Sequence, residues 1–261
     1  MNCLFMPRGS IALRAPRSHL CLPLPAGFTP PETEAARRRL SSAMADGCGV
    51  SSVTALFSSP RPNVWVCAFL HGASRRKRAA TYEQGRPGSI TYIPRDAELV
   101  IADGVCGRLY LSGPSRSTVF DWLPALNGTL FPARRPAEPF TFRPFQLAPL
   151  RFLSVSARRP TYSSAPWAAL ALKGISWQEA GSPTSLSRRL WCGDGFEELD
   201  VTGEPWPPHL LSVAFSMTPV SARHAYTAEL YEGRCPMLRA TLSLATFEAV
   251  GALTSLAWST P

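Results

Sequence analysis

The sequence has very little lysine, although it is strongly basic. Only Lys77 and Lys173 are lysines among the 27 basic residues, which leaves 25 arginines. This bias is typical of translation from a GC-rich genome, where arginine accumulates without selection for binding. The net charge of +9 would otherwise indicate an anionic partner such as nucleic acid. The charge by itself therefore does not select a function.

Paired cysteines are also missing. A zinc site or a disulfide framework needs closely spaced or matched cysteines, and this chain has no Cys-x-x-Cys pair. We therefore expect reduced, mostly buried thiols, which favours the cytosol or nucleus. The seven positions are Cys3, Cys21, Cys48, Cys67, Cys106, Cys192 and Cys235.

Long apolar runs do not occur. No window approaches the roughly 20 apolar residues that a membrane-spanning helix requires. Arg8, Arg14 and Arg17 interrupt the stretch in which a secretory signal would need a continuous apolar run. We therefore expect a soluble protein with no membrane partner.

Motifs that carry catalysis or bind cofactors are not found. The four histidines have no metal-ligand spacing, and no nucleophile elbow, Walker loop or dinucleotide fingerprint occurs. The acidic stretch at 193–200 lacks the alternating oxygen ligands of a calcium loop, and Asp194-Gly195 predicts a hairpin turn. The sequence thus predicts a protein that is not an enzyme, with no cofactor and no metal.

Proline and glycine are abundant, with 26 and 18 residues in a chain of 261. This composition favours short strands joined by turns over long helices. Residues 1–60 are rich in Pro, Arg and Ser without periodicity, and we interpret them as a disordered arm. Residues 61–261 are predicted to form one mainly β, antiparallel domain.

Strand-length apolar runs recur through that domain, with one helical interruption. Ser115 is placed to cap a short helix near 115–123. From there a core-facing stripe at helical spacing is formed by Val119, Trp122, Leu123 and Leu126. Pro124 is expected to end or kink it, and 131–149 is expected to be a surface loop. The predicted strands are 64–70, 89–93, 98–102, 107–112, 150–155, 167–175, 210–217, 225–231, 237–247 and 251–258.

One dense basic cluster stands out, made of Arg75, Arg76, Lys77 and Arg78. Four adjacent cations in a polar loop present the charge that an acidic importin groove recognises, so the cluster predicts a nuclear-import signal. The simpler interpretation is a solvated charge run. A furin-type cleavage site would need a secretory route that the N-terminus does not supply.

Two groups of residues resemble the "unique long gene four" nuclear protein family of alphaherpesviruses. The first runs from Pro87-Gly88-Ser89-Ile90 through Leu99-Val100-Ile101, Leu109-Tyr110 and Ser115–Thr118 to Trp122 and Phe131-Pro132. The second is Leu210–Phe215 with Thr227–Tyr231 and Gly233. Together they cover about a third of the chain. The N-terminal arm departs from the family pattern.

The resemblance implies a non-enzymatic viral accessory protein of the host nucleus. Such a protein gathers in nuclear bodies through association with viral or host nuclear proteins, and it has no catalytic residues to carry over.

Two other functions are kept as alternatives. One is a degenerate hydrolase with a dUTPase-like jelly roll, in which Asp103 would be the base that activates water. The other is a basic nucleic-acid-binding protein, which is possible but not favoured because no aromatic residues interleave with the basic cluster.

Overall fold

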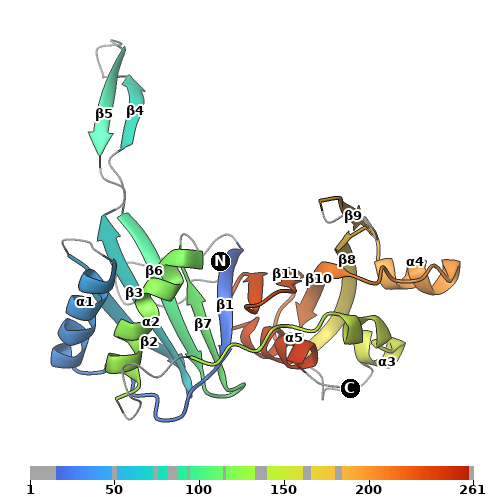
Figure 1. The fold of residues 1–261 in the computed structure, drawn as a ribbon, viewed down its shortest axis with the longest axis horizontal. Coiled ribbons are helices and arrows are strands. Elements are labelled where there is room, and N and C mark those ends of the chain that lie inside the picture. The colour runs from blue at the N-terminus through green and yellow to red at the C-terminus, as the bar shows by residue number, and fades with distance from the viewer. Residues whose placement is uncertain are drawn as a thin grey trace.

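The computed structural model describes residues 16–48, 52–72, 76–81, 87–92, 95–113, 116–132, 140–160, 166–179 and 184–258. Ten of its strands form one antiparallel sheet in the order β2-β3-β6-β7-β1-β12-β11-β10-β8-β9 (Figure 1). The two remaining strands, β4 and β5, form a separate two-stranded sheet. The prediction of a mainly β fold is therefore confirmed.

The elements have the following bounds. The sheet strands are β1 (Arg17–Pro23), β2 (Thr54–Arg61), β3 (Val64–Gly72), β6 (Arg95–Asp103), β7 (Arg108–Ser112), β8 (Trp167–Gln178), β9 (Leu186–Leu190), β10 (Leu210–Pro219), β11 (Tyr226–Tyr231) and β12 (Met237–Ala240). The separate pair is β4 (Arg76–Thr81) and β5 (Pro87–Tyr92). The helices are α1 (Glu34–Cys48), α2 (Arg116–Leu130), the 3-10 helix η1 (Ala148–Phe152), α3 (Val155–Arg158), α4 (Gly195–Thr202) and α5 (Phe247–Trp258).

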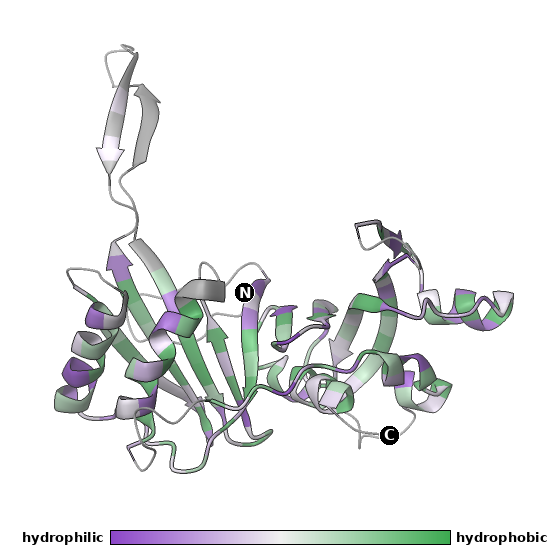
Figure 2. Cartoon of the chain, in the orientation of Figure 1, coloured by the Kyte–Doolittle hydropathy of each residue, from purple (hydrophilic) through white to green (hydrophobic). Residues whose placement is uncertain are grey.

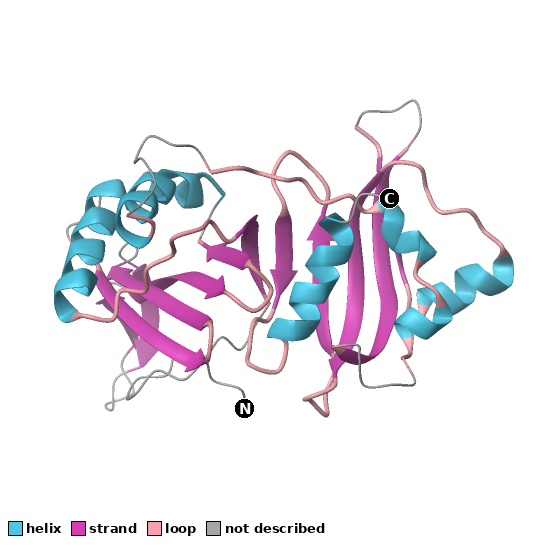
Figure 3. Cartoon of the chain, turned by 90° about the horizontal axis from the view of Figure 1, so that it is seen from below, coloured by secondary structure: helices cyan, strands magenta, loops and turns pink. Residues whose placement is uncertain are grey.

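The sheet separates two apolar cores. Successive strand residues point to opposite faces, and on β1 Leu20 and Leu22 belong to one core whereas Cys21 belongs to the other. The first core is closed by α1 and α2 and the second by α5. Figure 3 shows α1 and α2 at one end of the sheet and α3 and α4 at the other, with α5 lying across the strands between them.

Five strands, β2-β3-β6-β7-β1, form what we call the covered half of the sheet. Along β3 the side chains of Val66 and Ala68 are buried on one face, and those of Cys67 and Phe69 are buried on the other. Burial on both faces explains why this strand reads as an unbroken apolar run in the sequence.

The other five strands, β12-β11-β10-β8-β9, form what we call the open half. On β10 the side chains of Val213, Phe215 and Met217 are buried, whereas Ala214 and Ser216 between them are half-buried. One face of this half therefore packs on the core and the other remains accessible. Figure 2 shows this mixture of apolar and hydrophilic residues along the strands.

The expectation of a disordered arm over 1–60 is wrong for the described part of that segment. β1 lies in the middle of the sheet, where it pairs with β7 and β12, and α1 and β2 follow it. The apolar run of β1 is only a few residues long and flanked by prolines, so its burial depends on partners distant in the sequence. Residues 1–15 lie outside the described residues.

Two predicted strands are helical. The segment 251–258 belongs to α5, on which Val250, Leu253 and Ala257 are buried at helical spacing. The segment 150–155 covers the end of η1 and the start of α3. The predicted strand 237–247 stops at Ala240. No helix among the described residues is long and apolar enough to cross a membrane.

The predicted helix is present as α2, and its four stripe residues are buried. Pro124 does not end it: the helix continues to Leu130, and Leu126 and Leu130 extend the buried stripe beyond this exposed residue. Ser115 lies outside the described residues. The following segment is more than a surface loop, since Phe145 and Leu147 are buried in the core.

Candidate functional site

Three of the four residues of the basic cluster lie on a strand, which corrects the expectation of a loop for them. Arg76, Lys77 and Arg78 begin β4, and their backbones pair with Tyr92, Thr91 and Ile90 of β5. These β5 residues are strong strand formers, which accounts for the ladder. Arg75 lies outside the described residues.

The β4–β5 hairpin stands apart from the body of the molecule in Figure 1. It is inserted between β3 and β6, whose ends pair with each other at Gly72 and Arg95. The chain thus leaves the sheet and re-enters it at adjacent points. This placement separates the basic residues from both apolar cores.

A buried polar cluster lies where β3 and β6 approach the hairpin. Glu98 is only 2% exposed, and its carboxylate lies 3.1 Å from Nε2 of His71 and 3.9 Å from Nη2 of Arg17. Arg17 also donates to the carbonyl oxygen of Ala97 at 2.7 Å. A buried carboxylate needs such partners, so the cluster joins β1, β3 and β6 below the hairpin. Sequence reasoning missed it, although an acid beside an apolar run is a usable signal.

Asp103, the candidate base of the hydrolase alternative, is hydrogen-bonded to the backbone of its own turn. It is fully buried at the end of β6, and its Oδ1 accepts from the backbone amides of Val105 and Cys106 at 3.0 and 3.2 Å. This is the geometry of an Asx turn between β6 and β7. Burial is the main cause that raises the pKa of the Cys106 thiol to about 11, and the nearby Asp103 carboxylate adds to the rise.

The acidic stretch forms a helix start and not the predicted hairpin turn. Asp194 is the N-cap of α4 and accepts from the amide of Phe196 at 3.0 Å. A capping aspartate followed by glycine has the same letters as a hairpin turn, so the local signal was ambiguous. The acids that follow bind arginines: the pairs are Glu197 with Arg159, Glu198 with Arg189, and Asp200 with Arg158.

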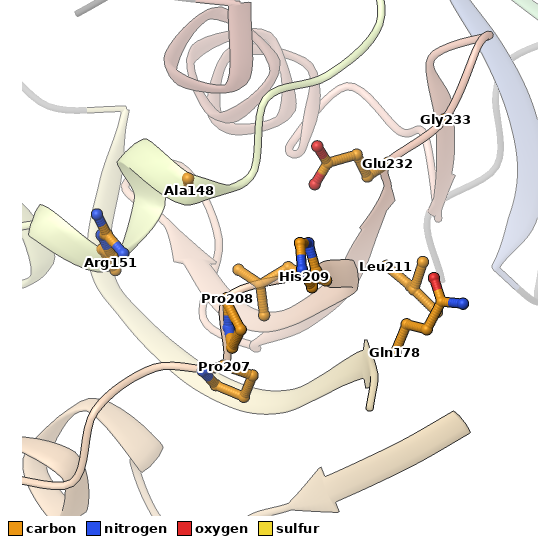
Figure 4. A pocket seen from close by; sticks show the side chains of 10 residues that line it. Ala148, Arg151, Gln178, Pro207, Pro208, His209, Leu211, Glu232 and Gly233 are labelled. Carbon is orange, nitrogen blue, oxygen red and sulfur yellow. The ribbon is translucent and has the colours of Figure 1, made fainter. Parts of the chain in front are cut away.

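A pocket of about 300 Å³ with a mixed polar and apolar lining lies at one end of the open half (Figure 4). Arg151, His209 and Glu232 contribute its ionisable groups. Partial burial raises the pKa of the Glu232 carboxyl, and the backbone of Leu147 and the charge of His209 oppose that rise. The pocket can hold a small polar molecule. Asp103 is not among its lining residues.

Five cysteines have free thiols: Cys21, Cys67, Cys106, Cys192 and Cys235. Cys21 and Cys67 are buried, and burial raises the pKa of Cys67 to about 12. Cys192 is exposed, in contrast to the expectation for most thiols. No group of three or more His, Cys, Asp or Glu residues in the described ranges is arranged to hold a metal.

No protein-family model matches the chain, and no curated protein sequence is similar to it. Most of the described residues that carry the herpesvirus resemblance lie on β5, β6, β7, α2, β10 and β11, whereas Phe131, Pro132 and Gly233 lie just outside these elements. Ser115 lies outside the described residues. Most of the described ones are buried, including Ile101, Tyr110 and Trp122. They are packing residues, so any shared role would have to come from surface features.

Proposed function

We propose that this chain is a non-enzymatic accessory protein of the host nucleus that acts by associating with viral or host nuclear proteins. The observation that carries the proposal is the hairpin that projects from the body with Arg76, Lys77 and Arg78 on its first strand. A projecting hairpin can be approached from more than one side, and a dense run of basic residues is the charge pattern of a nuclear-import signal.

The state of Asp103 also favours association over catalysis. A general base needs a carboxylate that is free to take a proton from water. One oxygen of Asp103 already accepts two backbone amides in a turn, and the whole side chain is buried away from water. The hydrolase alternative is tested by assaying nucleotide hydrolysis of the purified chain, and robust turnover that disappears in Asp103→Asn would support it.

The import role is tested with the full chain fused to a carrier too large to diffuse into nuclei. Arg76→Ala/Lys77→Ala removes two adjacent charges and should reduce nuclear accumulation several-fold, because recognition is electrostatic. The matched control is Arg38→Ala/Arg39→Ala, which removes two adjacent exposed arginines of α1.

Equal accumulation of the wild type and the β4 variant would end the import proposal. An equal loss in the α1 control would show that total charge matters instead of the hairpin. Proximity labelling in infected cells then identifies the neighbouring proteins. Labelling that recovers only enzymes of nucleotide metabolism or nucleic-acid-binding proteins, and no other nuclear protein, would contradict the association proposal.

A further inference from the structure

A groove of about 260 Å³ lies on the accessible face of the open half. Its floor contains the small side chains of Ala214 on β10 and Thr227 on β11. Longer side chains border it, with Arg188 and Leu190 on β9 at one side and Arg239 on β12 at the other. The full lining is Pro16, Lys173, Arg188, Leu190, Ala214, Phe215, Thr227, Ala228, Glu229 and Arg239.

The groove carries an excess of positive charge. Three cations, Lys173, Arg188 and Arg239, face one carboxylate, Glu229, which leaves two net positive charges. Lys173 donates to the carbonyl oxygens of Cys192 and Gly193 at 2.8 and 2.6 Å. These neutral acceptors hold the ammonium in place without neutralising it, so its charge stays available to an anionic partner.

The single carboxylate is occupied by neighbours within the sheet. Glu229 accepts from Ser212 Oγ at 2.9 Å and from the Tyr231 hydroxyl at 2.6 Å, and it lies 3.9 Å from Arg188. Burial and then the bond to Glu229 raise the pKa of Tyr231 to about 12. Glu229 is therefore fixed in the floor of the groove. Arg239 is hydrogen-bonded to the neutral phenol of Tyr231 and keeps its positive charge.

The groove also offers apolar contact. Leu190 is 64% exposed, and Leu186 on the same edge strand is 70% exposed. Base-stacking proteins place exposed aromatic rings along a basic groove, but the one aromatic residue in this lining, Phe215, is fully buried. Small floor residues, basic borders and exposed leucines suit a peptide better than a nucleic acid.

We propose that this groove binds an extended acidic peptide segment of a protein partner. Carboxylates of the segment pair with Arg188 and Arg239, and an apolar side chain packs on Leu190. The proposal rests on action by protein association, but it concerns a different surface from the β4–β5 hairpin. The volume accommodates a few side chains of a segment and not a folded domain.

Fluorescence anisotropy of the full chain tests the groove with a labelled peptide of repeated Glu-Glu-Leu units. The wild type should bind it saturably and more weakly as salt increases. Arg188→Glu/Arg239→Glu should weaken binding by about ten-fold or more, because both partner charges are reversed. The matched control, Arg223→Glu/Arg234→Glu, makes the same charge change at exposed turn arginines outside the groove and should retain the affinity.

Arg188→Ala/Arg239→Ala provides a milder variant with the same expected direction if charge reversal disturbs folding. Absence of saturable binding, or equal loss in the groove and control variants, would overturn the proposal. Tighter binding of oligothymidine that is lost in the groove variant would identify a nucleic-acid surface instead. The nuclear-import measurement does not involve these residues, so either proposal can fail while the other stands.

Discussion

The covered and open halves of the sheet contain five strands each but differ in how the chain stabilises them. In the covered half, β3 and β6 are buried on both faces between two cores. In the open half, β10 and β11 alternate between buried and half-buried residues. The outer end of this half also carries exposed ion pairs such as Arg189 with Glu198. The difference shows how one continuous sheet can combine strands that are buried on both faces with strands that leave one face accessible.

The two halves meet at β1, so this strand holds them together. Leu20 and Leu22 enter one core while Cys21 enters the other, and all three are at most 1% exposed. β1 also supplies the ladders to β7 and β12. Removing it would separate the halves and open both cores.

The largest expected effect follows from a chain that begins at Met44. It lacks β1 and most of α1, including the buried Leu40. The lost burial should exceed the roughly 5–15 kcal/mol by which domains are stable. We expect no cooperative unfolding transition by circular dichroism in urea. A chain beginning at residue 16 is the control and should unfold cooperatively, and cooperative unfolding of the shorter chain would contradict a central role for β1.

The second prediction concerns His19, which lies on β1 beside both halves. Burial is the main cause that lowers its pKa from 6.5 to about 4, and its Nε2 lies 3.2 Å from the carbonyl oxygen of Ala240 on β12. Below pH 6.5 the unfolded chain binds a proton that the folded chain takes up only near pH 4. Stability is therefore complete at pH 7 and decreases as the pH falls through this window, by about 3 kcal/mol at pH 4.

His19→Gln keeps a donor for Ala240 but cannot titrate. Urea unfolding of both proteins at pH 7 and pH 4 isolates the contribution of His19, because the other groups are common to both. The difference in stability between wild type and variant should move by about 3 kcal/mol in favour of the variant at low pH. Parallel pH profiles would show that His19 is not buried as a neutral side chain.

The comparison of halves also explains what the sequence could predict. Strands of both halves were recognised, because unbroken apolar runs such as 64–70 and alternating runs such as 210–217 are both typical strand patterns. The sequence predicts a strand over 251–258 because α5 is buried on most sides and its apolar residues are nearly continuous. The periodicity of apolar residues cannot distinguish a short buried helix from a buried strand.

Features that depend on distant partners could not be predicted. β1 is a short run that becomes a strand only between β7 and β12. The groove brings together Lys173, Arg188 and Arg239, which come from three strands and show no shared motif. The density of basic residues alone marks those of β4 in the sequence. Their pairing with β5 could not be predicted, because it depends on the register between the two strands.

The smallest effect is expected at Asp194, at the outer end of the open half. Its Oδ1 accepts from the amide of Phe196 in α4 and from the amide of Leu172 in β8, each at 3.0 Å. Asp194→Ala leaves both donors unpaired and should cost about 1–2 kcal/mol of unfolding free energy, whereas Asp194→Asn should retain most of it. Glu197→Ala removes only a carboxylate that is 59% exposed and pairs with the equally exposed Arg159, so its cost should stay below about 1 kcal/mol. Hydrogen exchange at the Leu172 and Phe196 amides provides the local readout, and it should accelerate in Asp194→Ala but not in Glu197→Ala. If both variants behaved alike, surface charge and not the cap would hold α4 to the sheet.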